Sequence, residues 1–294
     1  MMILDRVNPV RKFNKDMEKT KVSVNTNLTG LSNGVKSGLP IKGMTVIDCH
    51  GHLGSWDNTH IPKKEPEEII ETMDYLGIDK LCLSSFLGCS CDFRRGNDIV
   101  GQEIRKYPQR LIGYVTINPN YPDEILQELE RCEREYGMKL VKIHPFCHEY
   151  PADGASYQDF WKYANKKAKI VLTHTWEADR NCGPGIFGRI AHKYAGVKII
   201  LGHSGVTYKG CEEAIKVARE NDNIYLDIAS SQPHFGMLER FVKEVGADKV
   251  LFGSDIPFLE PAAQVAKIAY AKISESDKKK ILGINMKMLL EESY

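Results

Sequence analysis

Eight short apolar runs, separated by amphipathic stretches of helical length, are the feature that most limits how this chain can fold. The runs are rich in β-branched residues and leucine, as expected of strands that are buried on both faces. They begin near Val46, Lys80, Leu111, Leu140, Ile170, Ile199, Ile224 and Val250. About eight βα units with right-handed crossovers close most economically into a barrel of parallel strands. The sequence therefore predicts an α/β protein with a (β/α)8 TIM barrel.

The rest of the chain limits the domain organisation. An open doubly wound sheet is the competing fold, but no glycine-rich phosphate loop follows the first strand. We expect the barrel to occupy residues 41–294 as one domain, since α/β barrels of about 250 residues are single domains. Residues 1–40 are charged and then rich in Asn, Thr, Ser and Gly, with a short strand predicted at Val22–Val24. This N-terminal extension or arm could cap the barrel, contact a neighbouring subunit or be disordered.

Composition excludes several classes of partner. The formal net charge is +1, which gives no strong field for nucleic acid or for an acidic membrane surface. No apolar stretch approaches the roughly 18 residues that a membrane span needs, and the first residues lack the apolar stretch of a secretory signal. The eight cysteines lie mostly in strand-like or helix-like runs and are expected to be reduced. We therefore expect a cytoplasmic protein that acts on a small molecule.

Two histidines follow the first apolar run at a spacing that suits a metal. His50 and His52 are two residues apart, so on a strand both imidazoles point to the same face. Four later runs also end in a potential ligand, namely His144, His174, His203 and Asp255. In a parallel barrel the carboxyl ends of the strands meet at one rim, where active sites lie. The sequence therefore predicts a metal site at the barrel mouth.

The predicted ligand set is three histidines and one aspartate. These residues are His50, His52, His174 and Asp255. Such a set favours one divalent ion, Zn²⁺ first, with Fe²⁺, Mn²⁺, Co²⁺ or Ni²⁺ as alternatives. A metal lowers the pKa of a bound water from about 15.7 toward about 7 and so provides a nucleophile. Asp255 is the candidate for taking that water's proton. His203 could hydrogen-bond the water or polarise a substrate oxygen, or it could hold a second metal.

Lys142 leaves three interpretations open. It precedes His144 by two residues, so both side chains share a face of the fourth strand. The lysine could be carbamylated and bridge two metals, bind an anionic substrate, or pair with a buried acid. His144 is a candidate for lining the pocket or for a further ligand.

Other candidate substrate contacts lie in loops after the predicted strands. Trp176 and Arg180 follow the fifth strand, and Arg94 and Arg95 follow the second. The guanidinium group suits recognition of carboxylates or phosphates because it donates two parallel hydrogen bonds. The sequence therefore indicates Trp176 and Arg180 as substrate-binding residues, with Lys142 and His144.

The motifs at these strand ends carry a family resemblance. They are Ile47–His52, Lys142–Pro145, Leu172–His174, Leu201–Gly205 and Leu251–Pro257. Taken in order, they resemble the amidohydrolase superfamily, and within it the amidohydrolase-2 group that includes aminocarboxymuconate semialdehyde decarboxylase. The similarity covers about residues 44 to 290.

The resemblance implies one metal held by the residues that match His50, His52, His174 and Asp255. It also implies that His203 assists catalysis, and that a homodimer could form. Members hydrolyse, decarboxylate or hydrate small organic acids and lactones. The leading hypothesis is a metal-dependent hydrolase that cleaves a C–O or C–N bond of a small, anionic substrate. The alternatives are a nonoxidative decarboxylase of a small unsaturated acid on the same site, a phosphoesterase with two metals, and a binding protein with a structural metal.

Overall fold

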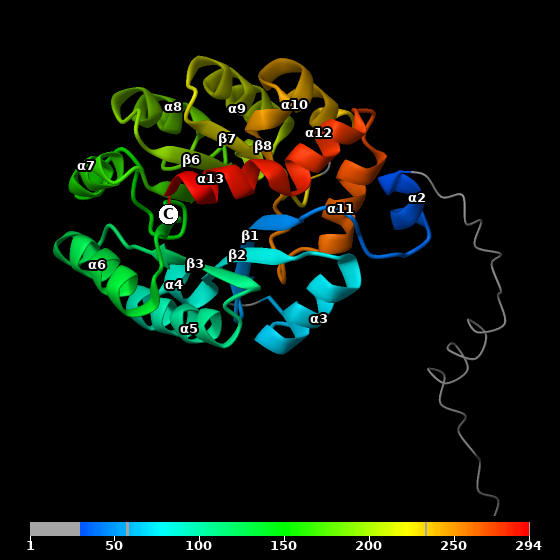
Figure 1. The fold of residues 1–294 in the computed structure, drawn as a ribbon. Helices are drawn as coiled ribbons and strands as arrows, with labels where there is room; N and C mark the ends of the chain where they lie inside the picture. Colours follow the sequence, from blue (N-terminus) through cyan, green and yellow to red (C-terminus); the bar gives the residue numbers. More distant parts are fainter. Residues whose placement is uncertain (1–29, 57–58, 233, 294) are drawn as a thin grey trace, which may run out of the picture.

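The computed structural model describes residues 30–56, 59–232 and 234–293. Within them, eight parallel strands form one sheet in the order β1-β2-β3-β4-β5-β6-β7-β8, and helices surround it (Figure 1). The strands are β1 Ile47–Leu53, β2 Lys80–Ser85, β3 Leu111–Thr116, β4 Leu140–Ile143, β5 Ile170–His174, β6 Lys198–Gly202, β7 Ile224–Asp227 and β8 Val250–Leu251. The fold is thus a nearly closed (β/α)8 barrel, as predicted.

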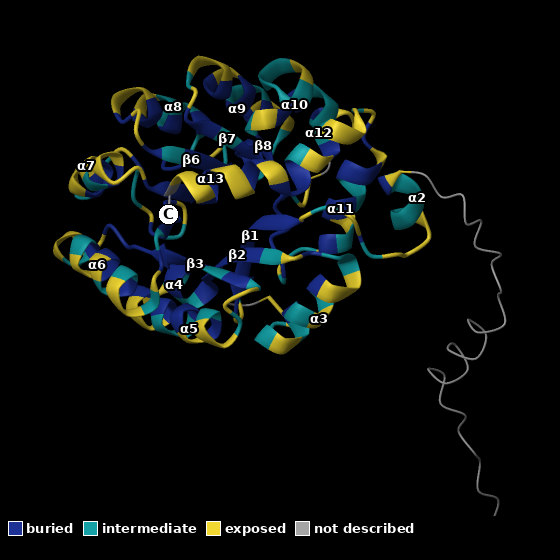
Figure 2. Cartoon of the chain, in the orientation of Figure 1, coloured by how far each residue is buried: buried dark blue, intermediate teal, exposed yellow. Residues whose placement is uncertain are grey.

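Helices precede, connect and follow the strands, and the longer ones bury one face each. They are α2 Leu31–Lys36, α3 Pro66–Leu76, α4 Phe86–Ser90, α5 Phe93–Lys106, α6 Ile125–Tyr136, α7 Gln158–Lys166, α8 Pro184–Lys193, α9 Tyr208–Glu220, α10 Met237–Val245, α11 Pro261–Tyr270, α12 Glu275–Lys279 and α13 Asn285–Ser293. Figure 2 shows the strands as buried while the helices turn exposed residues outward. This pattern explains why the strands are apolar on both faces and the helices amphipathic.

Local chemistry sets the ends of these helices. The α3 helix begins with a capping box between Glu65 and Glu68, and it ends at Gly77, whose left-handed conformation (φ 79°) suits glycine. The α5 helix begins at Phe93, where the carboxylate of Asp92 accepts a hydrogen bond from the backbone N–H of Arg95.

Backbone hydrogen bonds between β1 and the segment after β8 bring the first and last strands together. The N–H of Cys49 donates to the carbonyl of Phe252 at 2.8 Å, and the N–H of Asp255 donates to the carbonyl of His50 at 2.7 Å. The N–H of His52 donates to the carbonyl of Ile256 at 2.7 Å. This closure sets Asp255 beside the two histidines of β1, although about 200 residues separate them in the chain.

The opposite end of the barrel is closed by α13. Figure 1 shows this helix, in red, lying across one end of the barrel. Its buried Met286, Leu289 and Leu290 belong to one apolar cluster with Ile47 and Ile170, which are the first residues of β1 and β5. Since α13 covers the amino ends of the strands, the carboxyl ends form the open mouth.

Several details differ from the sequence predictions. The stretch after β2 that contains Cys89 forms the short helix α4, which was not predicted, and a π-helical segment, Lys280–Ile284, lies between α12 and α13. All eight cysteines lie within the described residues, and none of them forms a disulfide. The predicted strand at Val22–Val24 lies outside the described residues. Among the helices that the structure describes, none has the length and apolar character needed to cross a bilayer.

Candidate metal and substrate site

The histidines of β1 and the aspartate after β8 converge at the barrel mouth. Each of His50, His52 and Asp255 offers a ligand atom within 4.8 Å of the others, and all three side chains are buried. The Nε2 atom of His52 lies 3.1 Å from Oδ1 of Asp255, and Nε2 of His50 lies 3.5 Å from the same oxygen. Two imidazole nitrogens and one carboxylate oxygen that face a common point fit a divalent metal ion.

Partners on the far side of each ring orient these histidines. Nδ1 of His50 lies 2.7 Å from Oδ2 of Asp227, and Nδ1 of His52 lies 3.0 Å from Oγ of Ser84. Metal-binding histidines typically have such partners on the nitrogen that does not bind metal. The surroundings of both rings therefore also fit a metal site.

Burial and neighbouring groups together set the protonation states of these side chains. It is the main reason why the pKa values of His50 and His52 lie below the ordinary value, and Lys142 lowers both further. Burial alone would raise the pKa of Asp255, but the hydrogen bond with His52 and the adjacent His203 outweigh it, so that pKa is lowered. Neutral imidazoles and an ionised carboxylate are the forms that bind metal.

The backbone is strained where the site residues leave their strands. Asp255 has a φ of 62° and His203 a φ of 64°, and both are non-glycine residues in the left-handed region. Ser204 and Val206 also have positive φ values, 45° and 66°. Such conformations persist only where surrounding contacts hold them, and they gather at functional sites.

His174 and His144 lie in the same mouth but outside the 4.8 Å cluster. Their rings stack with centroids 4.4 Å apart, and His174 lies 4.9 Å from the ring of His203. The amine of Lys142 reaches Nε2 of His50 at 3.0 Å, and burial lowers the pKa of this lysine. The predicted residues on β4, β5 and β6 are thus neighbours of the cluster, and a role for His174 as a ligand stays a prediction.

A cavity of about 300 Å³ opens above these groups. His52, Lys142, His144, His174, His203 and Asp255 contribute polar atoms to its wall, together with Ser230, Ser231 and Gln232. Aromatic side chains form much of the remainder, namely Trp56, Phe86, Phe146, Trp176 and Phe258. Phe86 stacks on the ring of His52, with centroids 4.3 Å apart. A flat aromatic molecule with a few polar substituents suits such walls.

The predicted arginines do not reach this cavity. Arg180 is exposed and is absent from the cavity wall, whereas Trp176 from the same loop lines it. Arg94 is exposed as well and forms an ion pair with Glu124 at 2.9 Å. Among the described residues that line the cavity, Lys142 is the only lysine or arginine. A substrate-binding role for Arg180 therefore stays a prediction that the cavity wall does not support.

Sequence reasoning missed Asp227 and Ser84. Asp227 ends β7 and Ser84 lies in β2, and both are fully buried polar residues that contact the histidines of β1. The sequence contained a signal for Asp227, because this residue follows the apolar run Ile224–Leu226 just as the predicted metal ligands follow their apolar runs. Ser84 had none, because serine is common at the ends of strands.

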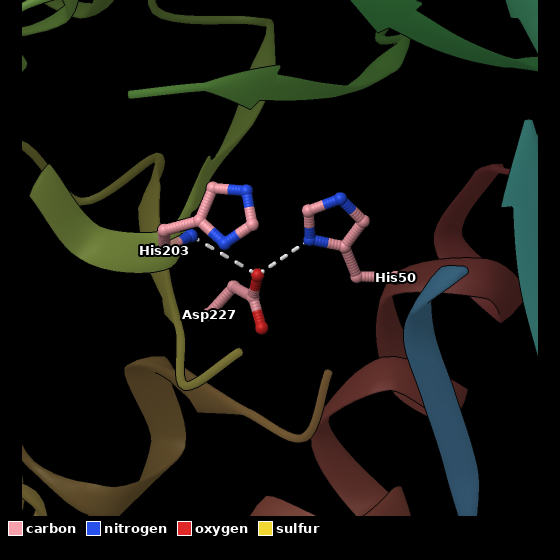
Figure 3. Close-up of side chains that lie close together, drawn as sticks. All are labelled: His50, His203 and Asp227. Atoms are coloured by element: carbon pink, nitrogen blue, oxygen red, sulfur yellow. Dashed lines mark hydrogen bonds and ion pairs between the residues drawn. The ribbon is translucent and has the colours of Figure 1, made fainter. Parts of the chain in front are cut away.

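Asp227 also brings His50 and His203 into a second compact group (Figure 3). Burial raises the pKa of Asp227 to about 7, while N–H groups of Ala229 and His203 pull it down. The contacts within the group are hydrogen bonds: Nδ1 of His50 at 2.7 Å and the backbone N–H of His203 at 3.2 Å, both to Oδ2. Nδ1 of His203 is occupied by the carbonyl of Ala229 at 3.0 Å. The group is therefore better explained as support for the first cluster than as a second metal site.

Comparison with known proteins gives consistent results. A family model described as amidohydrolase matches residues 91–287. The chain is 27% identical over 241 residues to a gamma-resorcylate decarboxylase from Polaromonas sp., which covers 64% of this chain and 72% of that protein. It is 24% identical over 230 residues to 2-amino-3-carboxymuconate-6-semialdehyde decarboxylase from Dictyostelium discoideum, which covers 64% of this chain and 63% of that protein.

Solved structures share the fold. A dihydroxybenzoic acid decarboxylase from Polaromonas sp., solved with bound manganese and the inhibitor 2-nitroresorcinol, superposes with a TM-score of 0.68 at 22% identity. The match covers 86% of this chain and 98% of that chain.

Proposed function

The chain belongs to the amidohydrolase family, and from this premise we propose that it is a metal-dependent, nonoxidative decarboxylase of a small aromatic carboxylic acid. The observation that carries the proposal is that the relatives reported above are decarboxylases. Hydrolysis, the leading hypothesis from the sequence, has no such support. Decarboxylation, its alternative, is therefore the function that we adopt.

The cavity supports an aromatic substrate of limited size. A volume of about 300 Å³ with walls of Trp, Phe and His side chains suits a single ring. Lys142 is the cation available to a substrate carboxylate, and Ser230 and Gln232 are neutral groups that could bind ring hydroxyls. A monocarboxylic acid with hydroxyl substituents meets these conditions. We therefore choose γ-resorcylate (2,6-dihydroxybenzoate) as the first substrate to test.

In this proposal His50, His52, His174 and Asp255 would hold one divalent ion. When bound, the ion supplies positive charge that orients the substrate oxygens and stabilises negative charge on them. Manganese is present in the Polaromonas decarboxylase structure, so Mn²⁺ stands beside Zn²⁺ as the candidate metal. The nearby Lys142 would neutralise the substrate carboxylate.

The chemistry requires a proton at the ring carbon that bears the carboxylate. Once that carbon is protonated, its bond to the carboxylate breaks, the electron pair returns to the ring and CO₂ leaves. His203 and Asp255 line the cavity and are the proposed carriers of the proton. Because Nδ1 of His203 is held by the carbonyl of Ala229, its Nε2 is the atom that can take up and deliver the proton. The aromatic walls would exclude water from the charged intermediate.

The direct test is CO₂ release by the purified full-length protein loaded with Mn²⁺ or Zn²⁺. γ-Resorcylate, other hydroxybenzoates and unsaturated acids would be compared with a panel of lactones and amides. We expect CO₂ from at least one aromatic acid. Hydrolysis of a lactone or an amide, with no CO₂ from any acid, would overturn the proposal and restore the hydrolase hypothesis.

Two histidine variants test the site itself. His174→Ala should lose bound metal and activity together. His192→Ala is the matched control, since His192 is exposed on α8, and it should keep both. Full activity in His174→Ala would remove His174 from the ligand set.

A further inference from the structure

We propose that Asp227 is a shared positioning residue, whose single carboxylate fixes the ring of His50 and the backbone of His203 together. The inference rests on the metal site of the proposed function. It goes beyond that function because it assigns a role to a residue that neither binds metal nor touches substrate. The proposed metal ligand His50 and the proposed proton carrier His203 are therefore both held in position by the carboxylate of Asp227.

All three polar contacts of the carboxylate are with nitrogen atoms. Oδ2 lies 2.7 Å from Nδ1 of His50 and accepts from the backbone N–H of His203 at 3.2 Å. Oδ1 accepts from the backbone N–H of Ala229 at 2.9 Å. Figure 3 shows the carboxylate between the two histidines. Asp227 is fully buried, so solvent does not compete for these bonds.

The bond to Asp227 selects one tautomer of His50. Two backbone N–H groups donate to Asp227 and favour its ionised form. A carboxylate only accepts hydrogen bonds, so Nδ1 of the neutral ring must carry the proton. Nε2 then keeps its lone pair and faces Asp255 and Lys142 at 3.5 and 3.0 Å. The ring of His50 is therefore set in the form that can bind a metal.

His52 lacks this control. Its Nδ1 faces the hydroxyl of Ser84, which can either donate or accept a hydrogen bond. The carboxylate that His52 faces is the proposed ligand Asp255, 3.1 Å from its Nε2. Of the two β1 histidines, only His50 has a carboxylate beside its Nδ1.

The end of β7 also holds the strained turn after β6. The N–H of His203 donates to the side chain of Asp227, and Oγ of Ser204 donates to the backbone carbonyl of Asp227 at 2.8 Å. His203 and Ser204 both have positive φ values, which non-glycine residues rarely adopt. These bonds help to explain how the turn is kept and how the ring of His203 reaches the cavity.

An amide cannot replace this carboxylate. In the Asp227→Asn variant, the NH₂ group of the new side chain would have to face either the N–H of Ala229 or the two histidine donors. In the first orientation a buried donor loses its acceptor. In the second, Nδ1 of His50 must accept a hydrogen bond, which moves the ring proton to Nε2 and blocks that nitrogen as a ligand. The substitution thus changes the chemistry while nearly preserving the shape.

The test combines metal affinity with the state of the imidazole. Asp227→Asn and the control Asp222→Asn, at a fully exposed site, would be titrated with Mn²⁺ and with Zn²⁺ against a chelator. We expect Asp227→Asn to bind metal about 10- to 100-fold more weakly and Asp222→Asn to match the wild type. Nitrogen-15 NMR of metal-free protein should show His50 with its proton on Nδ1 in the wild type.

Two results would overturn the proposal. One is a folded Asp227→Asn variant whose metal affinity stays within threefold of the wild type. The other is a wild-type His50 that carries its proton on Nε2, a measurement that applies even if the variant does not fold. Neither readout requires decarboxylation, so a protein that releases no CO₂ would refute the proposed function without deciding this one.

Discussion

Gly253 lies against the carboxylate of Asp227, and its replacement by alanine tests the close packing of the candidate site. A Cβ at this position would overlap Oδ1 of Asp227 and come within 2.9 Å of Cβ of His50. Gly253 does not have a positive φ, so its backbone accepts alanine and any cost is steric. Because Asp227 is held by N–H groups on both oxygens, the carboxylate cannot move aside freely.

The magnitude follows from what must move. Relief of the overlap requires a shift of about 1 Å to restore ordinary contact distances. Such a shift weakens at least one hydrogen bond to a charged group, worth about 1.5–3 kcal/mol, and overpacking of a tight site costs about 1–3 kcal/mol. We therefore expect Gly253→Ala to lose roughly 2–4 kcal/mol of unfolding free energy, or about 4–8 °C in Tm. Metal affinity should fall about tenfold or more, because Asp227 orients His50.

The assay compares thermal unfolding and metal titration with those of a matched glycine variant. Gly34 lies in α2, and a Cβ added there meets nothing within 4 Å. Gly34→Ala should keep or raise Tm, since alanine is favoured over glycine in a helix by about 0.5–1 kcal/mol. If Gly253→Ala melted within 1 °C of the wild type and bound metal as tightly, the steric reasoning would be wrong.

Three further predictions concern substrate, pH and metal. Trp176→Ala should lower kcat/KM at least tenfold because Trp176 lines the cavity, whereas Arg180→Ala should change it less than twofold; equal losses would show that the cavity is misassigned. Burial lowers the pKa of His148 to about 4, whereas the unfolded value is about 6.5. As the pH falls below 6.5, the unfolded chain therefore binds the proton first, and the unfolding free energy is about 2 kcal/mol lower at pH 5. Denaturant unfolding of His148→Gln should show a smaller fall of the unfolding free energy between pH 6.5 and pH 5. An unchanged fall would exclude His148 as its source. Chelation should lower Tm, and Mn²⁺ or Zn²⁺ at 100 times its Kd should restore about 2.7 kcal/mol; a Tm that ignores added metal would contradict a site formed in the folded protein.

Much of the barrel could be predicted from the chain because its strands are buried on both faces. Continuous apolar runs mark such strands directly, and the runs at Lys80, Leu111, Leu140 and Ile170 begin where the structure begins β2 to β5. The helix α4 was not predicted, because Phe86–Ser90 is too short and too apolar for helical periodicity to appear. Short elements are fixed by tertiary contacts, here the packing of Phe86 on His52.

The sequence by itself determined the alternation of strands and helices and the ligand-type residues at the strand ends, because periodicity and residue type are local properties. It also indicated that His50 and His52 share a face. Only the tertiary structure decided that Asp255 lies beside them, that Asp227 supports them and that Arg180 is absent from the cavity wall. Barrel closure sets Asp255 beside β1 through backbone hydrogen bonds that no local pattern encodes. Which loop residues reach the mouth depends on side-chain directions that follow from packing.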